Sequence, residues 1–324
     1  MSAKVECVKS TDPFLQSRIL PNWEQDYTQL SGGLFVGGVA RTSIENIQVF
    51  REWINQAVDQ RAVADDNVLM IGITLHKTRS SWQHREMEPD SLFILRAGEE
   101  ARFRTSAQSD IIAATIDSDY LESLCQGLYA VSTSTLTYGA SILTGDPKYI
   151  SRFRSLLLST LCSTLKNPLT IDVEYSRKNL AEEVTIAALQ AMGSITSANR
   201  NVSQNHRIHR AIVDRTRSFI HDHPDHNPTV AELCEYLGMG PRGLHNAFMQ
   251  VLGVNPSTYI RQVRLHAAHK EILQGVDSIT DIAIRWGFWH LGMFSKYYKQ
   301  QFGEAPSVTC RNPPQLFSES WLRS

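Results

Sequence analysis

The sequence predicts an α+β protein built from two domains, and three observations lead to this prediction. The chain has 324 residues, which is enough for two separate hydrophobic cores. From about Gly33 to Ile116 it consists of short β-rich runs, such as NVLMIGITLHK and DSLFILRAG, separated by turn-forming residues. From about Ile208 to Cys310 the apolar residues recur at helical spacing in short segments. We therefore expect an antiparallel barrel or jelly roll, followed by an all-α domain.

Two amphipathic stretches, at 146–166 and 173–192, predict helices between these domains, and the first begins with Asp-Pro, a frequent helix start. The TIAALQAM run and four leucines could pack on the barrel alone or also meet a second subunit: Leu157, Leu158, Leu161 and Leu165. The polar run GSITSANRNVSQN predicts a linker. We expect domains at 1–194 and 208–312, a linker at 195–207 and a flexible tail at 313–324.

The second domain contains an internal repeat, TVAELCEYLGMGPRGLHNAFMQVLGVNPS at 229–257 and SITDIAIRWGFWHLGMFSKYYKQQFGEAPS at 278–307. Apolar and Gly positions match at an offset of 49 before the turn and 50 after it, as in Gly238 with Gly287 and Phe248 with Tyr298. Each copy predicts a short helix that ends at a Gly, followed by a helix with an i, i+4, i+8 apolar seam. Such a unit used twice is a tandem helix-turn-helix.

The residues that would face away from these seams suit contacts with base edges and phosphates. In the first copy they are Arg242, His245, Asn246 and Gln250, and in the second His290, Leu291, Ser295, Lys296 and Lys299. The stretch 256–275 between the copies predicts one long linker helix. It would hold the two recognition helices about one turn of duplex, ~34 Å, apart. The repeat therefore predicts a domain that binds double-stranded DNA, although a repeated helical hairpin without that role is the alternative.

Charge and composition set weaker limits. The formal net charge is -1, but 207–312 holds 12 Lys and Arg against 9 Asp and Glu, whereas 1–206 holds 19 against 23. The five Cys are scattered and contain no CxxC pair, which favours a reducing compartment. The N-terminal sequence MSAKVECVKSTDPF lacks the apolar core of a signal peptide, and no run approaches the ~20 apolar residues of a membrane span. We expect a cytoplasmic protein without a membrane partner.

The mouth of a barrel is a natural pocket for a small ligand. Six polar or aromatic side chains on or beside the predicted strands are candidate lining residues: Trp53, His76, Trp82, His84, Arg96 and Arg104. Each could equally be an ordinary surface or core residue of the barrel.

Motifs for catalysis or metal binding are weak or absent. The chain has no GxSxG and no P-loop, and GMGPRG at 238–243 fits GxGxxG but joins two predicted helices. His76 and His84 are the only His before residue 200, so a metal-dependent cupin site is not expected. HDHPDH, with His221, His223 and His226, reads as a helix end, where positively charged His is favourable. We predict no enzyme, no catalytic residue, no metal and no required cofactor.

The C-terminal hundred residues resemble the DNA-binding domain of the AraC/XylS family of bacterial transcription regulators. The family signature IxxIAxxxGFxxxxxFxxxFKxxxGxxPxxyR is present here at Ile279, Ile282, Ala283, Gly287, Phe288, Phe294, Tyr298, Lys299, Gly303 and Pro306. Trp289 and Gly292 stand where the family frequently has Ser, and Thr309–Cys310 replaces the usual Tyr-Arg, with Arg311 one place later. The resemblance implies a cupin-like β-barrel for effector sensing and dimerisation at 1–194, and RNA polymerase as a partner.

The resemblance extends to the ethanolamine-operon regulator subgroup through WEQDYTQLSGGLFVGGVARTSIENIQVFRE, LHNAFMQVLGVNPSTYIRQVRL and WGFWHLGMFSKYYKQQF. It implies a transcriptional activator whose effector is ethanolamine with adenosylcobalamin, and a homodimer would suit recognition of repeated half-sites. Three alternatives remain: a regulator of another catabolic pathway, a constitutive architectural DNA binder, and a cupin-fold enzyme with an accessory DNA-binding domain.

Overall fold

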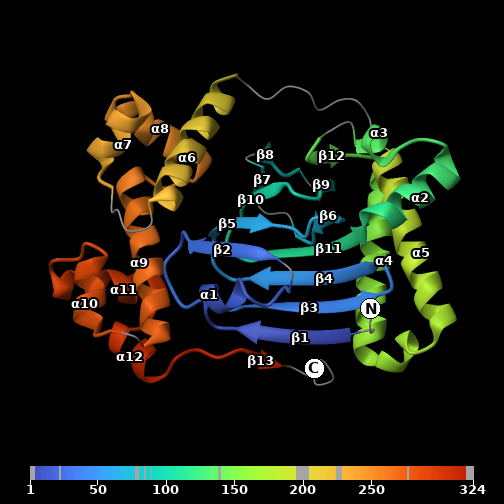
Figure 1. Ribbon diagram of the computed structural model, residues 1–324, viewed down its shortest axis with the longest axis horizontal. Helices are drawn as coiled ribbons and strands as arrows, with labels where there is room; N and C mark the ends of the chain where they lie inside the picture. Colours follow the sequence, from blue (N-terminus) through green and yellow to red (C-terminus); the bar gives the residue numbers. More distant parts are fainter. Residues whose placement is uncertain are drawn as a thin grey trace. The chain divides into compact units, whose positions relative to one another are not determined.

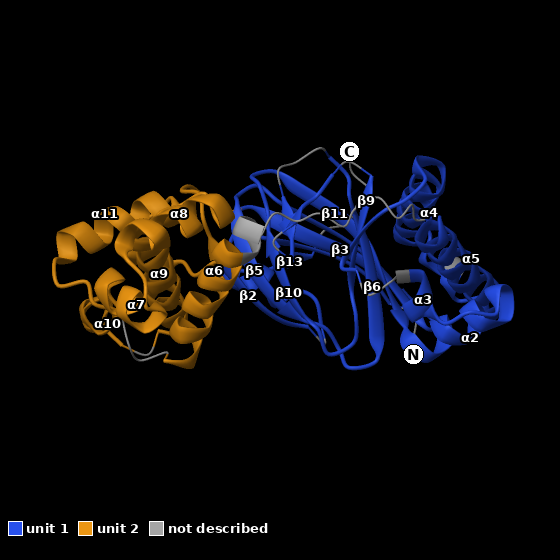
Figure 2. Ribbon diagram, turned by 90° about the horizontal axis from the view of Figure 1, so that it is seen from above, with its two compact units in different colours: residues 1–27, 36–199, 315–324 blue, residues 28–35, 200–314 orange. Residues whose placement is uncertain are grey.

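The computed structural model describes residues 4–21, 23–76, 80–83, 85–88, 90–137, 140–194, 204–223, 228–275 and 277–318. The chain divides into two compact units, coloured separately in Figure 2. Unit 1 holds 1–27, 36–199 and 315–324, and unit 2 holds 28–35 and 200–314. Unit 1 is built on β-sheets and unit 2 is helical, so the predicted α+β class is confirmed.

Unit 1 is organised around two β-sheets. The eight-stranded sheet has the order β12-β9-β6-β11-β4-β3-β1-β13, and all its neighbouring strands are antiparallel. Its strands are, in that order, Ile142–Thr144, Ser91–Leu95, Val68–Thr74, Ser109–Asp117, Ile47–Ile54, Gly37–Ile44, Lys4–Ser10 and Phe317–Ser318. The second sheet has the order β2-β5-β10-β7-β8, with strands Glu24–Gln29, Val58–Val63, Glu100–Arg104, Ser81–Trp82 and Arg85–Glu86.

Strand β4 shows how the large sheet is covered on both faces. Val49 belongs to a core cluster shared with helices, whereas its neighbour Phe50 belongs to a cluster of the opposite face with Trp82, Phe93 and Phe103. Because successive side chains of a strand point to opposite faces, neighbouring residues of β4 contribute to the two clusters.

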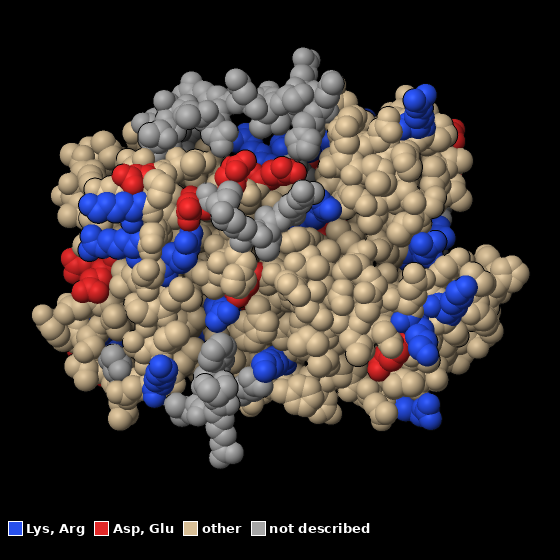
Figure 3. Space-filling model, turned by 180° about the vertical axis from the view of Figure 1, so that it is seen from behind, with Lys and Arg blue, Asp and Glu red and all other residues tan. Residues whose placement is uncertain are grey.

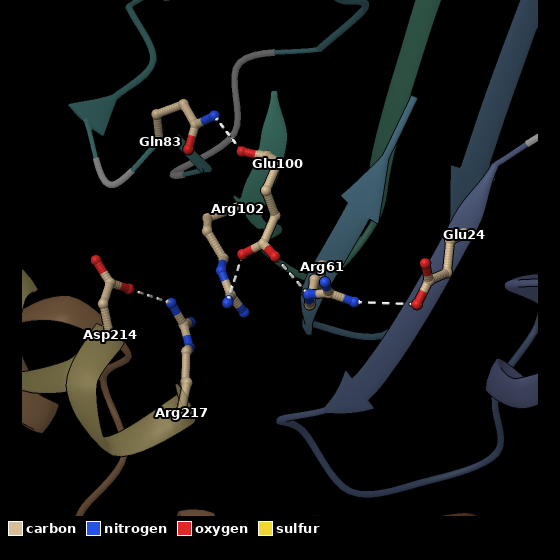
Figure 4. A network of polar contacts seen from close by, with 7 residues as sticks. All are labelled: Glu24, Arg61, Gln83, Glu100, Arg102, Asp214 and Arg217. Carbon is tan, nitrogen blue, oxygen red and sulfur yellow. Dashed lines mark hydrogen bonds and ion pairs between the residues drawn. The ribbon is translucent and has the colours of Figure 1, made fainter. Parts of the chain in front are cut away.

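Polar contacts join the strands of the smaller sheet (Figure 4). Arg61 on β5 donates through Nε to Glu100 on β10 at 2.6 Å and through Nη1 to Glu24 on β2 at 3.3 Å. Gln83 donates through Nε2 to the carbonyl oxygen of Glu100 at 2.7 Å. One arginine thus ties together the edge strand and the two strands beside it.

The helices of unit 1 are α1 (Pro13–Gln16), α2 (Ser118–Tyr129), α3 (Thr133–Thr137), α4 (Pro147–Lys166), the 3-10 turn η1 (Pro168–Ile171) and α5 (Glu174–Gly193). Helices α4 and α5 lie side by side against the large sheet (Figure 1). Asp146 caps α4 by accepting from the backbone N–H of Lys148 at 2.8 Å, as Asp-Pro predicts. Leu157 and Leu161 are buried in the core of unit 1, and packing within this unit accounts for them.

Unit 2 contains α6 (Gln204–Asp222), α7 (Val230–Leu237), α8 (Pro241–Val251), α9 (Pro256–Gln274), α10 (Ile279–Arg285), α11 (Leu291–Phe302) and α12 (Pro306–Arg311). Pairs α7–α8 and α10–α11 are the two predicted helix-turn-helix units, and α9 is the predicted linker helix. Among the described helices, none is both long and apolar enough to cross a membrane.

The compact units differ from the predicted domain ranges at two places. Residues 28–35 belong with the helical unit, because their backbone and side chains bond to α9 and α11. In the expected flexible tail, Phe317 and Ser318 form β13, which pairs with β1 at Lys9 and Val8. The predicted linker at 195–207 lies outside the described residues as far as 203, and α6 begins at Gln204.

Candidate nucleic-acid interface

The first helix-turn-helix unit is defined by local chemistry at its turn. Thr229 and Glu232 form a reciprocal capping box that starts α7. Gly238 ends α7 with φ of 63°, a left-handed conformation that a residue with a Cβ adopts at a cost. Pro241 then starts α8, whose Leu244 and Phe248 are fully buried.

The second unit repeats this arrangement. Ser278 caps α10, Gly287 has φ of 76°, and α11 follows with Phe294, Tyr298 and Phe302 buried against α9. The buried hydroxyl of Tyr298 lies 2.5 Å from His269 Nδ1 on α9 and donates to Thr309 Oγ1 on α12 at 3.1 Å. Thr309, which departs from the usual family residue, is therefore a buried partner of the recognition helix.

The predicted contact residues lie exposed on α8 and on α11 with its preceding turn. They are Arg242, His245, Asn246 and Gln250 in the first unit, and His290, Leu291, Ser295, Lys296 and Lys299 in the second. Within the described part of the chain, Arg242, Lys296 and Lys299 form no ion pair, whereas Arg285 pairs with both Glu271 and Asp277. The three cations are thus available to a phosphate or a base.

Gln250 is the exception among these residues. Its Oε1 lies 2.5 Å from Nδ1 of His209 on α6, so the side chain is already engaged within unit 2. We expect Gln250 to position α8 against α6 more than to read a base.

Three exposed apolar side chains on or beside α8 and α11 were not among the predicted contacts, and one of them is Met293 on α11, with 41% of its surface exposed. Trp289, in the turn before α11, exposes 75% of its surface, and Met249 on α8 exposes 43%. Among these side chains, only Trp289 stands out in the sequence, because it replaces a Ser that is frequent at this position in the family signature. Lys and Arg are scattered over the face drawn in Figure 3 and do not form one basic field on it.

Residues 28–35 form a segment, here called the strap, that is built into unit 2. The backbone N–H of Gln29 donates to His266 Nε2 on α9 at 2.8 Å, and Gln262 Nε2 donates to the carbonyl oxygen of Leu30 at 2.8 Å. At the end of α11, the carbonyl oxygen of Gln301 accepts from Gly33 N–H at 3.2 Å. The strap therefore bridges the linker helix and the C-terminal end of the second recognition helix.

Unit 1 contains a hollow of about 690 Å³ at the ends of β4 and β11. Its lining includes two of the predicted ligand residues, Trp53 and His76, together with Asn55 and Asp110. Asp110 is buried, and its two carboxylate oxygens accept hydrogen bonds from Arg51 Nη2 and Nε at 2.7 and 2.9 Å. Trp53 and the polar groups beside it make this hollow a candidate pocket for a small molecule.

The other ligand candidates do not line this hollow. Trp82 is buried in the core and donates through Nε1 to the carbonyl oxygen of Ile94 at 3.1 Å. Arg96 donates to the carbonyl oxygen of Ala140 at 2.8 Å, and Arg104 is a half-buried residue of β10 whose pKa is lowered by burial. His84 lies outside the described residues.

The HDHPDH stretch shows no metal geometry in its described part. His223 Nδ1 lies 2.8 Å from the carbonyl oxygen of Phe219, one turn earlier, and the two rings are tilted by 30° with centroids 4.6 Å apart. His226 lies outside the described residues. Among the residues that are described, no three His, Cys, Asp or Glu could together hold a metal ion.

Parts of this chain are similar to known proteins. The helix-turn-helix domain family matches residues 233–312. The XylDLEGF operon transcriptional activator of Pseudomonas putida is 39% identical over 101 residues, which are 30% of this chain and 32% of that protein, so the match spans about a third of the relative. The XylDLEGF operon transcriptional activator 2 of the same organism is 30% identical over 144 residues, 44% of this chain and 86% of that protein.

Among solved structures, the AraC-like transcriptional activator CuxR is 14% identical, with 82% of this chain and 95% of that chain covered and a TM-score of 0.42. Two observations assign the chain to a family. Its two helix-turn-helix units recur at a fixed offset, and the sequence match covers 86% of a known activator. The chain belongs to the AraC family of transcriptional regulators.

Proposed function

We propose that this protein is a sequence-specific activator of transcription that places α8 and α11 in successive major grooves of an operator. The observation that supports this most directly is the pair of matched recognition helices, each with exposed side chains suited to DNA. Together they carry three cations, Arg242, Lys296 and Lys299, that form no ion pair with any residue the structure describes. Contacts with phosphates would supply salt-dependent affinity, and contacts with base edges would supply the sequence preference.

The proposal is tested with duplexes that the full-length protein selects from a random library. Arg242→Ala and Lys296→Ala should each weaken binding to the selected duplex by about 10-fold, and loss of a phosphate contact should lower the slope of log affinity against log salt by about one. Lys166→Ala, which removes an exposed charge from α4 of unit 1, is the matched control. Equal affinity for all four proteins would contradict the assignment of this surface.

Unit 1 is proposed to sense a small molecule in the hollow beside Trp53 and His76, and to form the contacts of a homodimer. On the resemblance to the ethanolamine-operon subgroup, the effector is ethanolamine with adenosylcobalamin, and the regulated partner is RNA polymerase. A ligand that binds only the folded state must raise the melting temperature. Thermal unfolding and operator titrations with each compound, with both and with neither test this. If neither measurement changes, ethanolamine with adenosylcobalamin is not the effector.

A further inference from the structure

We infer that the second helix-turn-helix unit reads thymine C5-methyl groups through Trp289 and Leu291, whereas the first unit reads hydrogen-bonding base edges. The inference deepens the proposed function and rests on it, because it assumes that α11 enters a major groove. It assigns to the two recognition helices two different kinds of base contact.

The first ground is the exposure of apolar side chains at the beginning of α11. Trp289 is 75% exposed, Leu291 40% and Met293 41%, all within five residues. Single exposed apolar residues are common, but a group that includes a largely exposed Trp marks a surface that binds something.

The second ground is a comparison of the two repeats at the offset of 50. Arg242 in the first turn of α8 corresponds to Gly292, so the second unit has no cation there. A Cβ added to Gly292 would meet no atom within 4 Å, so this part of α11 is open on the outside. Asn246 corresponds to Lys296, and the two cations of α11 therefore lie one and two turns farther along the helix.

The geometry of groove recognition connects these observations. The N-terminal residues of a recognition helix are the ones that reach base edges. In the major groove each thymine presents a methyl group, which apolar side chains recognise by contact. Trp289, in the turn before α11, and Leu291, the first residue of the helix, lie at that N-terminal end. They can offer few of the donors that guanine or adenine edges require.

The apolar group is continuous with the candidate DNA surface. Leu291, Ser295 and Lys299 follow at i, i+4 and i+8, so they share one exposed face of α11. The face begins apolar and becomes basic, as expected when its first turn lies against bases and its later turns against the phosphate backbone. This continuity favours DNA over a protein as the occupant.

The inference is tested by removing single methyl groups from the DNA. Duplexes are selected from a random library by the wild-type protein and by Trp289→Ala, and the two sets are compared. Thymines that the wild type prefers and the variant does not are then replaced one at a time by deoxyuridine. Each replacement should weaken wild-type binding by about 4-fold, the value of one buried methyl or methylene group. Trp289→Ala should bind the thymine and deoxyuridine duplexes equally, and Trp289→Phe should recover part of the discrimination.

Controls separate the possible results. Tyr175→Ala removes an aromatic residue of unit 1 that is 74% exposed, and it should keep the full response to deoxyuridine. If wild type and Trp289→Ala lose the same affinity on methyl removal while Arg242→Ala still weakens binding, the inference fails and the proposed function stands. If Arg242→Ala also has no effect, the proposed function fails with it. If Trp289→Ala binds the selected duplex as wild type does but no longer supports transcription from it, the exposed group serves a protein partner, and the inference is overturned.

Discussion

Gln29 and Gln301 are 272 positions apart in the sequence, and each donates a side-chain hydrogen bond to the backbone carbonyl oxygen of the other. Gln29 Nε2 lies 2.8 Å from the oxygen of Gln301, and Gln301 Nε2 lies 2.6 Å from the oxygen of Gln29. Both side chains are buried. Since residues 27 and 36 belong to unit 1, the chain enters the DNA-binding unit and returns. The strap therefore connects the two units covalently, in addition to the linker and to the crossing between residues 314 and 315.

Replacing Gln29 by Ala should destabilise the C-terminal end of α11. The Gln29 amide lies within 2.9 Å of three carbonyl oxygens, those of Ser31, Gly33 and Gln301. Leaving such buried acceptors without a donor costs roughly 1–3 kcal/mol. Hydrogen exchange at the amides of 300–303 should accelerate in Gln29→Ala. Gln274→Ala removes an exposed amide from α9 and should leave exchange there unchanged.

The strap could not be predicted from the sequence, whereas the tandem repeat could. The repeat rests on local signals, such as Gly238 and Gly287 after short apolar helices, and these signals recur at a fixed offset. The strap depends on backbone carbonyls and glutamine amides, which have no spacing pattern. Glutamine is usually exposed, so nothing in the sequence marked Gln29, Gln262 and Gln301 as buried.

The ligand candidates show the same limit. Residue type alone selected Trp82, but its ring completes the core with Phe93 and Phe103 at centroid distances of 4.8 and 5.5 Å. Trp53 and His76 are 23 positions apart and meet only because β4 and β6 both pair with β11. The strand register that brings them together is a property of the whole sheet.

Replacing Gly238 by Ala should destabilise the first helix-turn-helix unit. Nothing lies within 4 Å of the added Cβ, so the expected cost of about 1–2 kcal/mol comes only from the positive φ of 63°. Gly292→Ala in α11 is the matched substitution, because it also meets no atom but has a helical backbone, and it should stabilise by about 0.5–1 kcal/mol. Urea unfolding of both variants gives the comparison, and equal effects would rule out backbone strain at Gly238.

Replacing Tyr298 by Phe should lower stability by about 1–2 kcal/mol, because the hydroxyl joins His269 on α9 and Thr309 on α12 to the recognition helix. Tyr297→Phe is the neighbouring control, since Tyr297 is only partly buried and contacts Arg261 through its ring. Thermal unfolding should show a lower melting temperature for Tyr298→Phe alone. Equal melting temperatures for the two variants would mean that the buried bonds make no net contribution.

Glu52 should make the stability of unit 1 fall as the pH rises. Burial raises the pKa of this carboxyl, although Gln16 and Tyr27 donate to its Oε1 at 2.9 and 2.6 Å and favour the charged form. The folded state therefore holds the proton at pH values where the unfolded state has lost it. Stability is greatest below the ordinary pKa of the group, and it declines as the pH rises from that value through the raised pKa.

Glu52→Gln cannot titrate and should lack this part of the decline, whereas Glu183→Gln, on an exposed face of α5, should behave as wild type. The pH dependence of stability in the three proteins is compared through urea midpoints measured from about pH 5 to pH 8. Parallel curves for wild type and Glu52→Gln would show that the carboxyl titrates alike in the folded and unfolded states.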